Sequence, residues 1–229
     1  ISDGELRLDT GADNDAVSIV RVAGAVKLGA GADTLSAQDS KLSIDCGGGA
    51  DTVSLTGCEG VVEGGEGGDR ITVRGGNCTL RGGAGNDRLT SVSGVSTLDG
   101  GAGKDTLRAD AGNATLKGGA DADAMTGGAD CQLFLYDALD GALDVISQFT
   151  RGEDHLTFTA AALGMEAATP FQATMFRLGA AVGSHAQFVF DPRTSILSFD
   201  RDGAGAGAAT VVARMSGLTT MSASDIWIV

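Results

Sequence analysis

Several features that define common protein classes are scarce or missing in this chain of 229 residues. It has 2 Pro, 2 His, 1 Trp and 1 Tyr, and aromatic residues make up 4% of it. No apolar run reaches the roughly 18 residues of a membrane-spanning helix. A net charge of −14, with no stripe of Lys and Arg, excludes a typical nucleic-acid-binding protein. Neither His-Glu-x-x-His nor Gly-x-Ser-x-Gly occurs, so we expect no catalytic activity of the protease or esterase kind, and no enzyme.

Glycine and aspartate are abundant instead. The chain has 37 Gly, and of its 30 acidic residues 24 are Asp. Because 42% of the residues are hydrophobic, simple disorder is not expected. Short carboxylates in tight glycine turns are typical of sites for a hard cation such as calcium.

The sequence is repetitive, with a period of about 18 residues. Seven loops share one phase and begin at Thr10, Leu28, Cys46, Gly64, Gly82, Gly100 and Gly118. Their second residue is always Gly. Their sixth residue is always Asp, at Asp15, Asp33, Asp51, Asp69, Asp87, Asp105 and Asp123. Their eighth residue is always apolar. Their fourth residue is Gly31, Gly49, Gly67, Gly85 or Gly103 in the inner loops, and Asp13 or Asp121 in the outermost ones. Gly and Asp both tolerate positive φ, so one backbone geometry would serve all seven loops.

The stretches between these loops have their own apolar eighth position but no recurrent Asp. Each turn of the repeat is therefore expected to hold two short strands, with an Asp-rich corner and a degenerate corner. This pattern predicts an all-β fold, a right-handed parallel β-roll or β-helix solenoid over residues 1–135. Residues 136–229 are expected to form a small antiparallel β cap. Ile1 enters in phase within a turn, so we expect the chain to be the C-terminal part of a longer protein.

Stacked turns of such a roll would bring the seven Asp into one column of carboxylates. Like charges about 4.8 Å apart repel, and calcium ions between turns would bridge them. Seven loops leave six gaps and therefore predict about six Ca²⁺ ions. The expected ligands are the seven Asp, with Asp13, Asp121, Gly31, Gly49, Gly64, Gly67, Gly82, Gly85, Gly100 and Gly103. We expect the chain to be unfolded without calcium. The alternative is a metal-free solenoid in which Asp only forms turns.

Residues 82–90 match the GGxGxDxUx nonapeptide, and the chain thereby resembles RTX proteins. Only alternate nonapeptides match, so the resemblance implies one row of calcium and leaves a second row open. Asp144–Phe149 and Gly152–Phe158 resemble the segment that closes the roll in serralysin-type C-termini. The tail Ser224–Val229 is similar to the end of their type I secretion signal. The resemblance implies a protein of a Gram-negative bacterium that leaves through a type I exporter and folds outside the cell.

Other interpretations remain open at this stage. A structural or adhesive cell-surface protein, S-layer-like and self-associating, would use the same array. So would the trailing module of an RTX protease, lipase or epimerase. Asp137, Asp140 and Asp144 either bind one further ion or are solvated loop residues. Cys58 and Cys78 fall in adjacent turns, at a spacing that would allow a disulfide.

Overall fold

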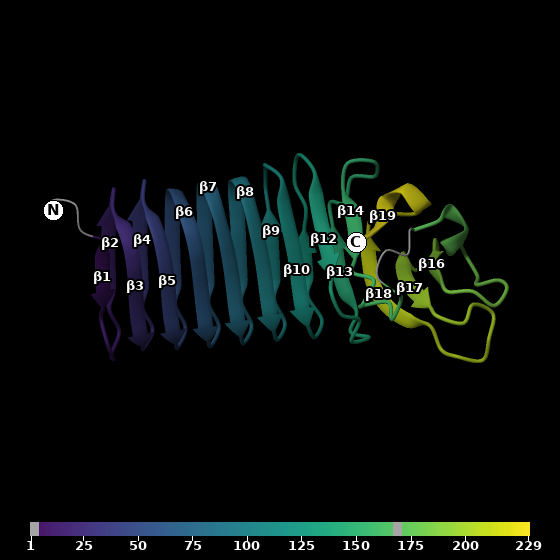
Figure 1. Ribbon diagram of the computed structural model, residues 1–229, viewed down its shortest axis with the longest axis horizontal. Coiled ribbons are helices and arrows are strands. Elements are labelled where there is room, and N and C mark those ends of the chain that lie inside the picture. Colours follow the sequence, from purple (N-terminus) through teal and green to yellow (C-terminus); the bar gives the residue numbers. More distant parts are fainter. Residues whose placement is uncertain (1–4, 167–170) are drawn as a thin grey trace.

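The computed structural model describes residues 5–166 and 171–229, and Ile1 lies outside them. Its turns are stacked along one long axis, from β1 at one end to a smaller C-terminal cap at the other (Figure 1). The strands of the stack are β1 (Leu6–Asp9), β2 (Ala16–Val20), β3 (Ala23–Ala30), β4 (Thr34–Gln38), β5 (Lys41–Gly48), β6 (Thr52–Glu66), β7 (Arg70–Ala84), β8 (Arg88–Ala102), β9 (Thr106–Ala109), β10 (Ala114–Ala120), β11 (Ala124–Thr126), β12 (Gln132–Tyr136), β13 (Asp144–Ser147) and β14 (His155–Phe158). The predicted all-β parallel solenoid is confirmed.

The register between turns equals the repeat length of the sequence. Leu35 pairs with Val53 and Val53 with Ile71, all in parallel strands. The apolar eighth positions of the Asp-bearing loops stack inside the roll, and the corresponding positions of the degenerate halves stack opposite them. Ile71, for example, is fully buried. Each turn thus covers the apolar edge of the turn before it, which is how a solenoid builds a continuous core.

The loop glycines are required by close contact between turns. Gly85 has φ of +132°, and a Cβ on it would lie 1.8 Å from the carbonyl oxygen of Gly67. No side chain fits at that distance. The two non-glycine residues at this fourth position, Asp13 and Asp121, also have positive φ, of 79° and 73°. Positive φ therefore recurs at the fourth position of all seven loops, at 73–79° in the two Asp and 115–142° in the five Gly.

Parallel stacking continues past residue 135, the expected end of the roll. β13 pairs with β11 and β14 with β12, both in parallel. The sequence offset between stacked residues, however, becomes longer than 18 here. Asp144 stacks on Asp123, 21 residues earlier. On the opposite edge Asp154 stacks on Gln132, 22 residues earlier. Short insertions lengthen the loops of this last turn while its strands stay in register.

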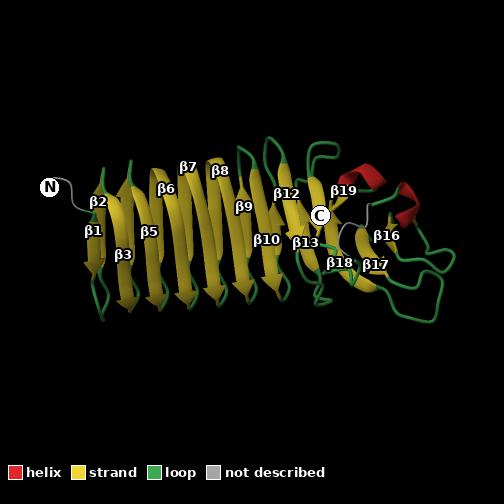
Figure 2. Ribbon diagram, viewed as in Figure 1, coloured by secondary structure: helices red, strands yellow, loops and turns green. Residues whose placement is uncertain are grey.

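The cap combines antiparallel and parallel pairing. It contains η1 (Ala173–Met175), β15 (Phe176–Leu178), β16 (Gln187–Asp191), β17 (Ile196–Asp200), β18 (Thr210–Ser216), η2 (Ala223–Asp225) and β19 (Ile226–Ile228). β16, β17 and β18 are antiparallel neighbours, whereas β18 and β19 add in parallel to β13 and β14. The only helical turns drawn lie in this cap, and the C-terminus returns to the side of β14 (Figure 2). Among the described residues no helix combines the length and apolar character needed to cross a membrane.

Aromatic side chains, scarce elsewhere, join the cap to the roll. The ring of Phe158 in β14 lies 5.2 Å from Tyr136 in β12 and 4.6 Å from Phe188 in β16, measured between centroids. Phe188 in turn lies 5.0 Å from Phe199 in β17. These rings fill the open end of the solenoid, where a further turn would otherwise be needed to cover the core.

The four cysteines are free thiols. Cys58 and Cys78 do lie in adjacent turns, where Sγ of Cys78 is 3.2 Å from the carbonyl oxygen of Cys58. The disulfide that their spacing would allow is therefore not formed in this structure.

Candidate metal centre

Each sixth-position Asp is hydrogen-bonded to the next by the same contact. The main-chain N–H of Asp69 donates to Oδ1 of Asp87 over 2.7 Å, and that of Asp87 donates to Oδ1 of Asp105 over 2.7 Å. The contact recurs at 2.7–2.9 Å all the way from Asp15 to Asp144. The structure thus brings the seven Asp into one column along one edge, and Asp144 adds an eighth.

The second carboxylate oxygen of these residues is buried and has no hydrogen-bond partner. This is true of Oδ2 in Asp15, Asp33, Asp51, Asp69, Asp87, Asp105 and Asp123. Apart from Asp15, these residues are at most 2% exposed. Leaving a buried carboxylate oxygen unpaired is unfavourable by several kcal/mol, roughly. A row of such oxygens fits a series of hard cations, which take carboxylate and carbonyl oxygens as ligands.

The first-position glycines leave open the space beside these oxygens. A Cβ on Gly64, Gly82 or Gly100 would lie 2.2–2.4 Å from Oδ2 of the Asp in the same loop. It would also lie 2.4–2.5 Å from the carbonyl oxygen of the first-position Gly in the next turn. A carboxylate oxygen and a main-chain oxygen from adjacent turns therefore face one small space. Within the described ranges no three acidic, His or Cys side chains gather around one point, so carbonyls must supply much of any ligand set.

The first three loops differ because Thr10, Leu28 and Cys46 stand where the later loops have Gly. Leu28 and Cys46 are fully buried. Burial raises the pKa of the Cys46 thiol well above its usual range, and the charge of Asp51 adds to this. The thiol thus lies near the carboxylate column. The six gaps between loops fall into two kinds: three in which a side chain occupies the first position, and three in which glycine leaves it open.

Burial raises the pKa values of the column carboxyls from Asp51 to Asp144. It raises the pKa of Asp69 to about 6, with further increases from Asp87 and Asp51, although the hydrogen bond from the Asp51 main chain opposes the shift. Burial likewise raises the pKa values of Asp105 and Asp123 to about 7 each. These carboxyls are therefore destabilised in their charged form as they stand, and a cation beside them would remove that penalty.

At the fourth position of each loop it is the main-chain carbonyl group, and not a side-chain carboxylate, that lies close to the neighbouring turn. A Cβ on Gly49 would lie 1.7 Å from the carbonyl oxygen of Gly31, and the same close approach recurs at Gly67, Gly85 and Gly103. The side chains of Asp13 and Asp121, both predicted as ligands, are exposed and lie outside the buried column. Whether any of these residues binds an ion remains a prediction.

In the described part of the roll, the opposite edge carries no such column. Ser96, Ala114, Gln132 and Asp154 occupy the corresponding positions. Nε2 of Gln132 donates to the carbonyl oxygens of Gly112, Ala129 and Asp130, over 3.2, 2.8 and 3.3 Å.

At the end of this edge Nε2 of Gln132 has hydrogen-bond acceptors, whereas its Oε1 is buried without a partner. An amide group sits in the carbonyl cluster that a cation would otherwise occupy. Asp154 accepts main-chain N–H groups on both carboxylate oxygens, from Gln132 and Thr150. Over the described residues, the row of buried and unpaired carboxylates is restricted to one edge.

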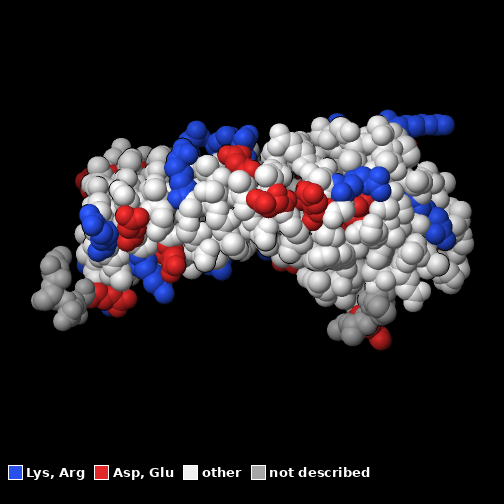
Figure 3. Space-filling model, turned by 90° about the horizontal axis from the view of Figure 1, so that it is seen from above, with Lys and Arg blue, Asp and Glu red and all other residues white. Residues whose placement is uncertain are grey.

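Basic and acidic side chains both lie on the face shown in Figure 3, and several acidic ones are neighbours near the middle of the molecule. Because the column carboxylates are buried, part of the net charge of −14 lies inside the molecule.

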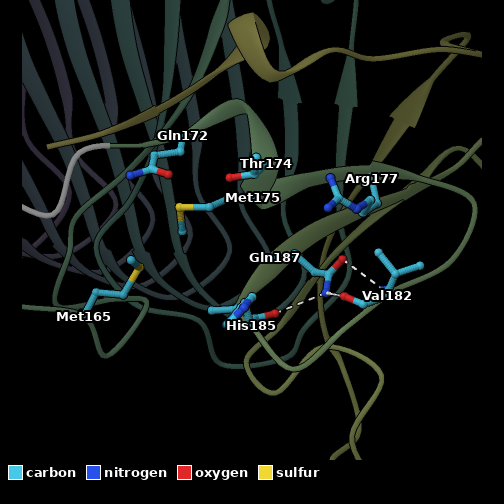
Figure 4. Close-up of a pocket in the computed structure, with 9 residues that line it drawn as sticks. Met165, Gln172, Thr174, Met175, Arg177, Val182, His185 and Gln187 are labelled. Carbon is cyan, nitrogen blue, oxygen red and sulfur yellow. Dashed lines mark hydrogen bonds between the residues drawn. The ribbon is translucent and has the colours of Figure 1, made fainter.

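The cap contains a separate cavity of about 640 Å³, lined by Met165, Met175, Arg177, His185 and Gln187 among others (Figure 4). Gln187 is tied to the local main chain, since its Nε2 donates to the carbonyl oxygens of Val182 and His185 over 2.7 and 3.1 Å. No hydrogen bond is seen between Thr174 and His185 within this described segment.

Comparison with protein families agrees with the geometry of the later loops. The model of the RTX calcium-binding nonapeptide repeat (4 copies) matches residues 63–98 and 99–130. This stretch contains Asp69, Asp87, Asp105 and Asp123 and the loops whose first residue is Gly. The chain thus carries RTX calcium-binding repeats and, with its β-solenoid, fits an RTX protein. A search of curated proteins finds no matching relative.

Proposed function

We propose that this chain is a calcium-dependent folding module of a secreted protein, with no catalytic activity of its own. The observation that carries the proposal is the column of seven buried carboxylate oxygens without partners. Calcium, when bound, would supply positive charge and bridge oxygens of adjacent turns. The chain's own residues would provide the binding site. The Asp carboxylates point into the roll, and the first-position glycines leave the space beside them open.

The metal-free roll is disfavoured by its own carboxylates. Their charges repel along the column, and their burial removes them from water. A cation that binds the folded chain but not the unfolded chain would therefore stabilise the fold by its own binding free energy. We expect up to six ions in the gaps between loops. They should bind most tightly in the three gaps that follow the loops beginning with Gly64, Gly82 and Gly100.

The proposal extends to export. Calcium sites of extracellular modules have dissociation constants of about 10⁻⁴–10⁻³ M, far above cytosolic calcium levels. The chain would therefore stay unfolded inside a Gram-negative bacterium, pass through a type I exporter, and fold outside. The exporter would read the tail before folding, because in the folded chain Ile226 is buried against β14. The roll would then serve as the C-terminal part of a larger secreted protein.

The test is a calcium titration of the chelator-treated chain, followed by far-ultraviolet circular dichroism, with magnesium as the control ion. We expect a cooperative transition from coil to β structure near millimolar calcium and none with magnesium. Asp87→Asn should shift the midpoint to higher calcium. Asp45→Asn is the matched control, since it removes the same charge from an exposed position of β5. A chain that is already β-structured in chelator and indifferent to calcium would overturn the proposal.

A further inference from the structure

One outer face of the roll carries basic and hydroxyl side chains in rows. It is formed by β4, β9 and the first halves of β6, β7 and β8, which lie side by side along the axis (Figure 1). Alternate residues of these strands are buried, and the residues between them face outward. Equal positions stack into an outward row of Thr34, Thr52, Arg70, Arg88 and Thr106. A parallel row beside it consists of Ser and Thr and ends in Arg108. We call this surface the arginine face.

The positive charge of this face is not neutralised by the chain itself. Arg70, Arg74 and Arg88 are exposed, and none of them forms an ion pair with an acidic side chain among the described residues. Arg70 also stands directly opposite Arg88 in the neighbouring strand, at a strand spacing of about 4.8 Å. Like charges placed opposite each other in a sheet repel and are destabilising. A chain with a net charge of −14 thus concentrates unpaired positive charge in one place.

The opposite outer face, formed by the second halves of the turns, arranges its charges differently. There Arg81 of β7 pairs with Glu63 of β6, one strand away. Nζ of Lys117 in β10 likewise lies 3.4 Å from Oδ2 of Asp99 in β8. Charges of opposite sign therefore face each other across adjacent strands, which is the stabilising arrangement. The roll neutralises one of its faces internally and leaves the arginine face available to an external anion.

The geometry of the rows narrows the class of that anion. Arg70 and Arg88 are one strand apart, which is close to the length of one sugar unit in an extended polysaccharide lying along the roll axis. An extended acidic peptide presents its same-side charges every second residue, about 6.6–6.8 Å apart, and does not match this spacing. Single-stranded nucleic acid stacks its bases on aromatic side chains, and membranes take up aromatic or long aliphatic ones. The outward positions of the described strands of this face include no aromatic residue.

We propose that the arginine face binds a linear anionic polysaccharide that lies along the roll axis. Arg70 and Arg88 each pair with an acidic group of the polymer, because a guanidinium fork donates two parallel hydrogen bonds to such an oxyanion. The hydroxyls of Thr52 and Thr106, which extend the same row, bind sugar hydroxyls on either side. A narrow polymer contacts these rows without approaching the acidic remainder of the molecule. This binding is separate from the proposed calcium function, since no carboxylate of the column takes part.

The test is calorimetric titration of the whole chain, under conditions in which circular dichroism shows it folded. The probes are a short oligogalacturonate, which carries carboxylates, and dextran sulfate, with neutral dextran as the control. We expect binding of an anionic probe that weakens with added salt, and no binding of neutral dextran. The double variant Arg70→Gln with Arg88→Gln should bind about tenfold more weakly or worse. Arg81→Gln with Arg193→Gln is the matched control, because it removes the same charge from exposed positions elsewhere, and it should stay within about twofold.

The two anionic probes identify the acidic group, and binding of neither would refute the proposal. Equal losses in the two double variants would refute it as well, because total charge alone would then explain the binding. Equal affinity for polyglutamate would exclude the polysaccharide as the specific partner. If the Gln variant fails to fold, Arg70→Lys with Arg88→Lys decides: it keeps both charges, loses the guanidinium forks and should bind about threefold more weakly. A chain that folds without calcium is titrated in chelator, so failure of the calcium proposal leaves this test intact.

Discussion

The main-chain N–H of Asp105 donates to Oδ1 of Asp123 over 2.8 Å, while Oδ2 of the same Asp123 carboxylate is buried and unpaired. One oxygen thus holds the two turns in register, and the other is left for a ligand. This division recurs along the column. It means that in the folded chain a main-chain contact fixes the orientation of each carboxylate.

Acidification should stabilise the metal-free roll. The pKa of an Asp in an unfolded chain is about 3.9. Burial raises the pKa values of Asp105 and Asp123 in the folded chain to about 7. Between these values the folded chain binds more protons than the unfolded chain. Its stability is therefore highest below about pH 4 and falls as pH rises toward 7. In chelator, far-ultraviolet circular dichroism should therefore record more β structure at about pH 4.5 than at about pH 7.

The calcium-bound roll should show the opposite trend in its ion affinity. Protons compete with calcium for the same carboxylates, so the calcium midpoint should rise as pH falls through about 7 to 6. Calorimetry in two buffers of different ionisation enthalpy would detect the released protons. Loss of β structure in chelator on acidification, or calcium binding without proton release, would contradict the raised pKa values.

Filling the open space over a first-position glycine should weaken calcium binding. In Gly82→Ala the new Cβ would lie 2.2 Å from Oδ2 of Asp87 and 2.5 Å from the Gly100 carbonyl oxygen. We expect a loss of about tenfold in affinity at that gap, or about 1.4 kcal/mol. Gly48→Ala is the control, because nothing lies within 4 Å of its Cβ. Equal effects of the two substitutions, by calorimetry, would show that the space does not matter.

The reverse change should improve a weak gap. Cys46 fills the first position of the third loop with a buried thiol. Cys46→Gly should raise calcium affinity at that gap, which calorimetry would record as one additional tight ion or as a lower overall midpoint. In chelator the variant should be less stable, since it loses buried sulfur. Unchanged ion binding in Cys46→Gly would indicate that loops with and without first-position glycine bind alike.

Replacing the amide at the opposite edge by a carboxylate should create a calcium dependence there. Gln132→Glu keeps the shape of the side chain but turns a carboxylate toward the carbonyl oxygens of Gly112, Ala129 and Asp130. At a calcium concentration that just folds the chain, we expect a loss of stability of about 1–3 kcal/mol, from unpaired buried oxygens. A higher calcium concentration should restore part of it, as measured by urea unfolding at the two concentrations. Gln132→Ala should be destabilised without this extra rescue.

The regular part of the fold and of the site could be predicted from the sequence, because a constant repeat length places identical positions one above another. The phase of Asp69, Asp87 and Asp105 therefore indicated both the turn and the edge. The end of the roll could not be placed in this way. There Asp144 continues the column after 21 residues and Asp154 the other edge after 22, so only the strand pairing reveals their positions.

Individual side chains at the junction were also beyond sequence reasoning. The motif treats Tyr136 as the residue after an apolar strand, and nothing in the spacing places its hydroxyl beside Asp144. In the sequence, Gln132 is likewise only one polar residue in the half of the repeat that lacks the recurrent Asp. Their roles depend on contacts between segments with irregular offsets, which only a three-dimensional structure supplies. For Asp13 and Asp121 the repeat pattern predicts metal ligands, but in the structure their side chains are exposed to solvent.

The constant register of the inner turns makes the roll a molecule of adjustable length. Residues 52–69 and 70–87 occupy equivalent places, and each contacts only its neighbours in the stack. Apart from the bulge at Arg74 between β7 and β8, duplicating or deleting one such unit leaves the remaining pairing in phase and changes the long axis by about 4.8 Å. Evolution or design can therefore set the distance between the two ends in steps of one turn, without redesigning the turns themselves or the cap.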